Sequence, residues 1–210
     1  YNEALDIAPD YAPALLGKAE TLRMTRKHND YFDVLARFVE DPHTPVQNKS
    51  DYLAAIIQRT DPKFIRSFKH QMDDILDKTV HVHPKDSTML GLVGIWYYST
   101  ERKPEAKKWF KLNAETYPQS VSARASLVEF LMYAEMWDDL AEEGRKAFDS
   151  FPQESAFLEM ASVGDFNMGR YKEVLDICDK VLDVAPTDSS KTLRAWSTKG
   201  DIYHRLGDSK

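Results

Sequence analysis

The sequence of 210 residues lacks what a cross-linked, fibrous or disordered protein needs. Its single cysteine, Cys178, excludes an internal disulfide scaffold, and 8 glycines and 10 prolines are too few for a collagen-like chain. A hydrophobic content of 42% excludes wholesale disorder. One cysteine does not decide the redox compartment, so a cytoplasmic and a periplasmic location both stay open.

A basic excess and a long apolar run are also missing. The chain has 28 Lys and Arg against 34 Asp and Glu, a net charge of −6. Because phosphate binding needs clustered Lys and Arg, we do not expect nucleic acid as a partner. The longest nearly uncharged apolar stretch, Met89 to Tyr98, is far shorter than the roughly 18–20 residues of a spanning helix, so we expect no membrane insertion by this segment.

What the sequence does contain is a repeat. Pro84, Pro118, Pro152 and Pro186 follow one another at intervals of 34 residues. Between successive prolines, apolar residues fall on two stripes of helical spacing, separated by a short break. A period of this length is typical of stacked helical hairpins, each too small to bury its own apolar faces. The pattern predicts an all-α protein.

The last segment carries the sharpest motif. Trp196, Lys199, Gly200 and Tyr203 occupy the slots of the pattern W-x2-L-G-x2-Y, with Lys199 in place of Leu. With its period and prolines, the sequence resembles the tetratricopeptide repeat (TPR) family, most strongly over residues 84–210. The resemblance implies an all-α, right-handed α-solenoid, or superhelix, of antiparallel helix-turn-helix repeats.

The resemblance implies that the chain is a single TPR array made of successive repeats. It begins inside a second helix and ends just after a first helix, near Gly207-Asp208, so we expect the sequence to be a piece of a longer protein. The expected segments are the end of a preceding repeat (1–11), a repeat (12–43), a longer divergent repeat (44–86), three further repeats (87–120, 121–154, 155–188) and the first helix of another (189–210).

Two irregularities predict longer helices. Thr44-Pro45 and Asp61-Pro62 each have the pattern of an N-cap followed by the first helical residue. The apolar spacing after the second of these predicts a long helix over about residues 62–81. Asp188 and the two serines after it are expected to cap a first helix about one turn longer than in the other repeats.

Candidate chemistry is sparse. His81 and His83 form a close pair but lack clear further ligands, and Cys178 falls on an inward-facing stripe, where a buried thiol is the default. Acid pairs such as Asp138-Asp139 suit a solvated helix face. The sequence has no nucleophile elbow, phosphate loop or H-E-x-x-H motif. We therefore expect no catalytic residue, metal or cofactor, and a protein that is not an enzyme.

The resemblance implies a binding surface instead. In this family the first helices line a concave surface, and ligands touch residues offset from the core stripe. By contrast Tyr97, in a core slot, is expected to be buried. The alternative is that some of the offset side chains pack against the neighbouring repeat. Carried onto this chain, the offset gives a candidate peptide-binding groove of Glu20, Met24, Ile95, Tyr98, Glu129, Met132, Tyr133, Glu159, Phe166, Asn167 and Asp201.

One subfamily does not fit. Chaperone-docking members hold a carboxylate with a Lys after the Trp slot and an Asn four residues later, and no repeat here has that pair. Leu16 with Glu20, and Gly91 with Ile95, occupy the positions in two of them. We therefore do not expect a chaperone carboxylate clamp.

Three functions remain in view. The first is a non-enzymatic scaffold that binds an extended protein or peptide segment, or a partner helix, in its concave groove. The second is a regulatory or spacer segment of a larger enzyme or sensor protein. The third, a nucleic-acid-binding helical repeat, is disfavoured by the net charge and by the absence of a Lys/Arg stripe on the groove positions.

Overall fold

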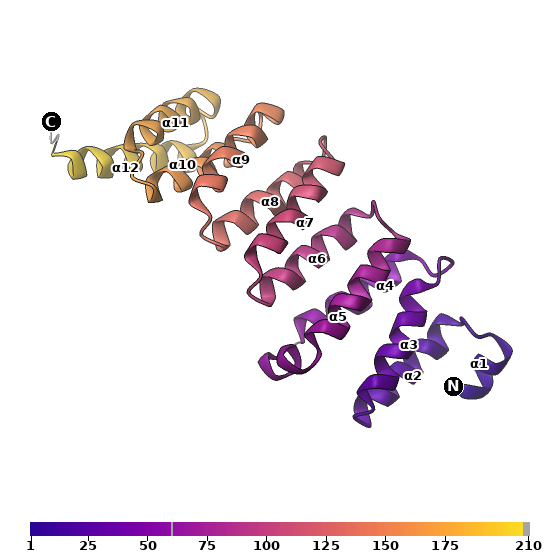
Figure 1. Ribbon diagram of the computed structural model, residues 1–210. Coiled ribbons are helices and arrows are strands. Elements are labelled where there is room, and N and C mark those ends of the chain that lie inside the picture. The colour runs from indigo at the N-terminus through magenta and orange to yellow at the C-terminus, as the bar shows by residue number, and fades with distance from the viewer. Residues whose placement is uncertain (60, 208–210) are drawn as a thin grey trace. The chain divides into compact units, whose positions relative to one another are not determined.

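In the computed structural model, residues 1–59 and 61–207 are described, and they form twelve helices and no strand (Figure 1). The predicted all-α fold of antiparallel helix pairs is confirmed. None of the described helices is both long and apolar enough to cross a bilayer. The helices are α1 (Asn2–Ile7), α2 (Ala12–Met24), α3 (His28–Glu40), α4 (Val46–Gln58), α5 (Pro62–Val82), α6 (Ser87–Ser99), α7 (Lys103–Thr116), α8 (Val121–Tyr133), α9 (Trp137–Ser150), α10 (Ala156–Asn167), α11 (Tyr171–Val184) and α12 (Ser189–Leu206).

The chain divides into two compact units. The first runs from Tyr1 to Asn113 and the second from Ala114 to Lys210, so the division falls within α7. The expected turn at Gly207-Asp208 is described only as far as Gly207, because residues 208–210 lie outside the described part. Each unit has its own core.

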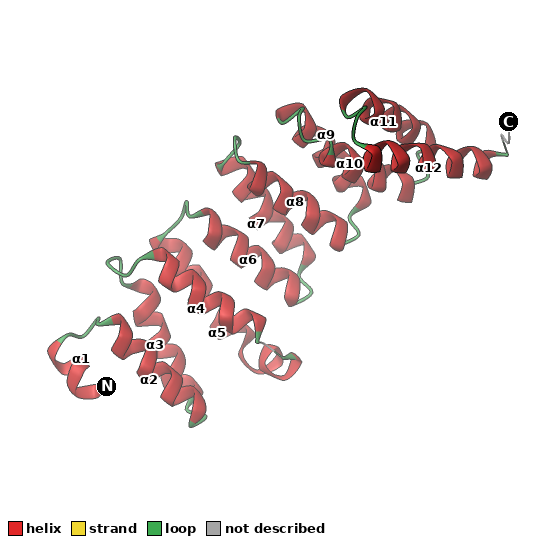
Figure 2. Cartoon of the chain, turned by 180° about the vertical axis from the view of Figure 1, so that it is seen from behind, coloured by secondary structure: helices red, strands yellow, loops and turns green. Residues whose placement is uncertain are grey.

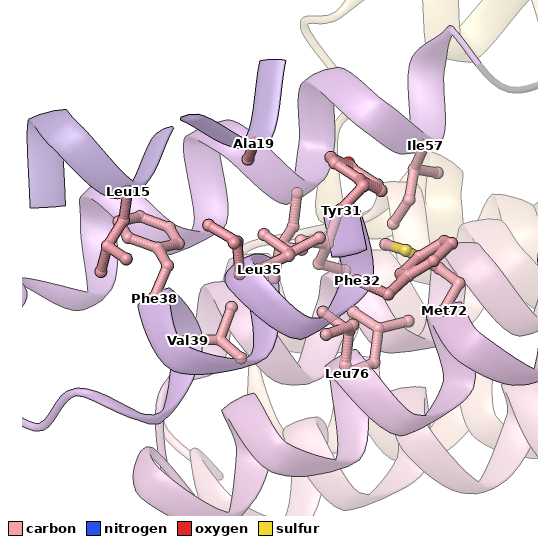
Figure 3. Packing of buried hydrophobic residues seen from close by; sticks show 14 of the residues in the cluster. Leu15, Ala19, Tyr31, Phe32, Leu35, Phe38, Val39, Ile57, Met72 and Leu76 are labelled. Atoms are coloured by element: carbon pink, nitrogen blue, oxygen red, sulfur yellow. The ribbon is translucent and has the colours of Figure 1, made fainter. Parts of the chain in front are cut away.

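The first unit buries its core where α2, α3, α4 and α5 meet. Leu15 of α2, Leu35 and Phe38 of α3, and Leu76 of α5 are all at most 1% exposed and lie close together (Figure 3). Helix α3 packs on both α2 and α5. Its apolar residues recur every three or four positions, so it buries one face and leaves the other in water.

Helix starts follow their caps in two of three predicted cases. An Asp61 carboxylate oxygen accepts the Phe64 N–H at 2.7 Å, and the long helix after it runs to Val82 as predicted. Asp188 accepts the N–H of Ser190 and begins the longer α12. The Thr44 prediction is wrong. Its hydroxyl donates to Asp41 at 2.6 Å, and Pro45 is the cap residue.

The turns after α6, α8 and α10 are short (Figure 2), and they share one backbone conformation. Glu101, Glu135 and Gly169, spaced 34 residues apart, have φ of 62°, 59° and 73°. In the first of these turns the Arg102 N–H then bonds back to the Tyr97 carbonyl at 2.9 Å. This left-handed step satisfies carbonyls at the helix end, and glycine adopts it more readily than glutamate does.

Glycines bring helices of the second unit close together. A Cβ placed on Gly164 of α10 would lie 2.6 Å from the Trp137 carbonyl oxygen of α9. On the facing helix, a Cβ on Gly144 would lie 2.9 Å from the Phe157 carbonyl oxygen. The two glycines therefore let α9 and α10 approach at backbone distance.

In the first unit, α5 and α6 are connected by a buried aromatic residue. That residue is Trp96, whereas the sequence predicted Tyr97. Trp96 is fully buried, and its indole N–H donates to Asp73 at 2.6 Å, while Arg102 donates to both oxygens of that carboxylate at 2.8 and 2.7 Å. Tyr97, expected in the core, is only half-buried. It stacks on Trp109 with ring centroids 6.5 Å apart, under the Arg102 guanidinium.

A lysine is buried in the same unit. Lys49 has no exposed surface, and its ammonium group donates to the Asp41 carbonyl at 2.6 Å and lies 2.9 Å from Nε2 of His83. Burial, and then the nearby Lys49 charge, lower the pKa of His83. In residues 1–59 and 61–207 no group of three His, Cys, Asp or Glu side chains could hold a metal ion.

Candidate functional site

Four predicted groove residues belong to the first unit. Met24 is 77% exposed, and Ile95 is also exposed. Tyr98 is half-buried. Glu20 is held in place, because it accepts the Tyr52 hydroxyl proton at 2.8 Å and an Arg23 N–H at 2.7 Å.

The second unit contains the other seven. Tyr133 is 66% exposed, and Glu129, Asn167 and Asp201 are exposed as well. Met132 is half-buried, as are Glu159 and Phe166. Four of the seven line one cavity, namely Glu159, Phe166, Asn167 and Asp201.

This cavity, of about 300 Å³, lies among α10, α11 and α12. Its floor is apolar: Ile177, Cys178 and Val181 of α11 line it, with Ala195 of α12, and all four side chains are buried. Val163 of α10 also lines it and is 38% exposed. An apolar floor of this kind can take an aliphatic or aromatic side chain.

The rim of the cavity carries both signs of charge. Glu159 and Arg194 form an ion pair of 2.9 Å across α10 and α12, while Lys191 and Asp201 line the cavity from α12. The Asn167 side-chain amide donates to the Val163 carbonyl at 2.8 Å. Two acidic and two basic side chains thus balance at the rim.

Phe166 also has a packing role. Its ring and that of Tyr171 pack in a T-shaped arrangement with centroids 5.7 Å apart, and the Arg205 guanidinium lies 5.1 Å from the Phe166 centroid. It therefore both lines the cavity and joins α10 to the helices beside it.

Cys178 has the environment of a structural thiol. Its side chain is 4% exposed, and burial raises its pKa above the usual value. The thiol is thus protonated at neutral pH, whereas the thiolate is the nucleophilic form.

Sequence reasoning missed several of the lining residues. Ile177 and Val181 were not predicted to line a groove, and neither was Arg194, which lies two residues before Trp196 in α12. The cap at Asp188 was a partial signal, because it predicts an added turn at the start of α12, and that turn carries the lining residue Lys191.

The antiparallel pairs, the 34-residue period and the left-handed turns define a helical-hairpin repeat protein. No protein-family model matches the chain, and no curated protein sequence matches it. Solved structures do.

Over 93% of this chain and 97% of the other, the fold is similar to that of YrrB, a TPR protein with an unusual peptide-binding site, with a TM-score of 0.54 and 14% identity. MamA is similar over 76% of this chain and 83% of its own, with a TM-score of 0.52 and 14% identity. A tetratricopeptide repeat protein from Parabacteroides merdae matches 94% of this chain with 74% of its own, with a TM-score of 0.50 and 13% identity. The chain has the TPR fold.

Proposed function

We propose that this protein is a non-enzymatic interaction scaffold whose second unit binds an extended peptide, or a partner helix, at the cavity among α10, α11 and α12. One observation carries the proposal: four of the groove residues that the resemblance to the TPR family implies, Glu159, Phe166, Asn167 and Asp201, line this cavity.

The geometry supports a peptide ligand. The floor of Ile177, Cys178 and Val181 would bury one apolar side chain, and such an anchor supplies much of the energy of peptide binding. The Glu159 carboxylate and the Arg194 guanidinium at the rim can exchange hydrogen bonds with backbone amides on either side of it. YrrB, which shares the fold, has a peptide-binding site, and this gives the proposal a structural precedent.

The test is selection of peptides on the immobilised chain from a random display library, followed by affinity measurement in solution. Val163→Lys places a charged side chain at the cavity, so we expect it to weaken a selected peptide at least about ten-fold. Val121→Lys is the matched control: Val121 begins α8, outside the cavity, and is 37% exposed against 38% for Val163.

Two results would contradict the proposal. If the selected peptides bind no better than their scrambled forms, the chain is not a peptide-binding protein. If both variants lose the same peptide affinity while their melting temperatures stay unchanged, the cavity is not the binding site.

A further inference from the structure

The first unit has a cavity of its own, independent of the one proposed for peptides. It has a volume of about 460 Å³ and lies among α2, α3, α4 and α5. Ala55, Ile56 and Phe64 give it an apolar wall, and Tyr31 and Tyr52 add aromatic rings. The remaining lining residues are Glu20, Arg23 and Arg59.

A buried hydroxyl group in this cavity lacks a partner. Tyr31 is 1% exposed, and its hydroxyl oxygen makes no hydrogen bond of normal geometry with any described residue. The nearby Tyr52 hydroxyl donates its own proton to Glu20 at 2.8 Å, and its oxygen is not in normal hydrogen-bond geometry with the Tyr31 hydroxyl. Since an unpaired buried hydroxyl is costly, a ligand acceptor at this point would be favoured.

The charges of the cavity do not balance. Glu20 is satisfied twice, by Tyr52 and by the side chain of Arg23, whose Nε and terminal N–H donate to one carboxylate oxygen at 3.0 and 2.7 Å. Arg59 is exposed at the same cavity, and although its charge helps to lower the pKa of Glu20, it forms no ion pair within 4.0 Å among the described residues. One positive charge therefore remains beside an apolar wall and an unused phenol donor.

We propose that this cavity binds a small monocarboxylic acid with an aromatic or aliphatic body. The Arg59 guanidinium is the partner of the carboxylate, the Tyr31 hydroxyl donates a hydrogen bond to it, and the body packs against Ile56 and Phe64. One uncompensated arginine matches one negative charge, and guanidinium pairs with carboxylate through planar, charge-assisted hydrogen bonds. A doubly charged phosphate would leave a second charge unmatched beside Glu20.

The experiment titrates the full 210-residue chain with 3-phenylpropionate and follows its backbone amide signals by NMR. We expect saturable shifts confined to the lining residues of α2, α3, α4 and α5. The neutral 3-phenylpropanamide has the same body without the charge, and we expect it to bind at least about ten-fold more weakly.

Three variants assign the contacts. Arg59→Gln should weaken 3-phenylpropionate at least about ten-fold, and Tyr31→Phe, which keeps the ring, about three- to ten-fold. Arg66→Gln is the matched control, because Arg66 is an exposed arginine of α5 that does not line the cavity. Melting temperatures of all three are expected to stay close to that of the wild type.

Several results would overturn the proposal. They are absence of saturable binding, equal affinity for acid and amide, or an Arg59→Gln variant that binds as well as Arg66→Gln. Tighter binding of the peptide acetyl-Ala-Ala-Phe with a free carboxylate than of 3-phenylpropionate would also overturn it, because the site would then belong to peptide termini.

Discussion

The two units join neighbouring helices in different ways. In the second unit, Gly144 and Gly164 let the backbones of α9 and α10 approach until no Cβ would fit between them. In the first unit, α5 and α6 are joined by a large indole, and Asp73 accepts hydrogen bonds from both Trp96 and Arg102. The same fold thus allows two kinds of helix–helix contact: a glycine joint, where small residues let the backbones approach, and a hydrogen-bonded joint, where large side chains fill the space between the helices.

The two joints fail for different reasons. A glycine joint has no room for added volume, because the atoms that a Cβ would meet include backbone that cannot rotate away. A hydrogen-bonded joint is sensitive to lost volume and to a partner left unpaired. Substitutions in each unit can therefore separate the two mechanisms.

The largest effect is expected at the indole. Trp96→Ala removes a fully buried side chain and should lower the free energy of unfolding by about 3–5 kcal/mol. Tyr97→Ala, its neighbour on the same helix, should cost clearly less because Tyr97 is half-buried. Urea unfolding of both variants measures the difference. Equal losses would mean that Tyr97 belongs to the core after all.

The next effect tests the glycine joint. Gly164→Ala should cost about 1–3 kcal/mol, since its Cβ would meet the Trp137 carbonyl oxygen at 2.6 Å. Gly200→Ala is the matched control within a helix, because a Cβ there meets nothing within 4 Å, and alanine favours the helix by up to about 1 kcal/mol. Thermal melting should move the two variants in opposite directions, and a shared direction would contradict the close approach.

A comparable or smaller effect, with a pH signature, is expected at Asp73. Burial alone would raise the pKa of this carboxyl, but the hydrogen bonds from Arg102 and Trp96 outweigh it and lower the pKa. The carboxylate therefore contributes stability above its unfolded pKa near 4, and that stability is lost as the pH falls through the lower folded value.

Asp73→Asn should accordingly cost about 1–3 kcal/mol at pH 7. Its deficit against the wild type should shrink as the pH is lowered below about 4. Chemical unfolding at several pH values makes the comparison. A deficit independent of pH would show that the ionised carboxylate is not what stabilises the joint.

The smallest effect concerns the turns, where the two units agree. Glu101→Gly in the first unit and Glu135→Gly in the second relieve a left-handed backbone and should each add about 0.5–1 kcal/mol. Gly169→Ala should lose about the same amount, because nothing near its Cβ position would clash and the backbone alone opposes it. The account is contradicted if, at each of the three positions, the form with glycine and the form without it melt at the same temperature.

The sequence predicted the fold through features that repeat along it. The proline interval and the caps at Asp61 and Asp188 depend on local backbone chemistry. They can therefore be predicted from a single sequence. Which of Trp96 and Tyr97 is buried was harder to predict, because α6 is apolar on most of its surface and its periodicity does not favour one face.

The candidate site was predictable only in part. The positions of Glu159 and Phe166 followed from the repeat, whereas the cavity depends on how α12 crosses α10 and α11. The burial of Lys49 was not predictable either, because its two partners lie 8 and 34 residues away in sequence. Contacts of that kind are set by tertiary packing, and helical periodicity does not contain them.

Cys178 provides a chemical probe of motion in the second unit. As the one thiol of the chain, it receives every maleimide or iodoacetamide label that reacts at sulfur, so no mutagenesis is needed to place a probe. Cys178 is 4% exposed at the cavity floor, so a reagent reaches its sulfur slowly, through the cavity or when α11 and α12 separate. The rate of alkylation therefore reports how accessible the cavity floor is, and a ligand bound in the cavity should slow the reaction.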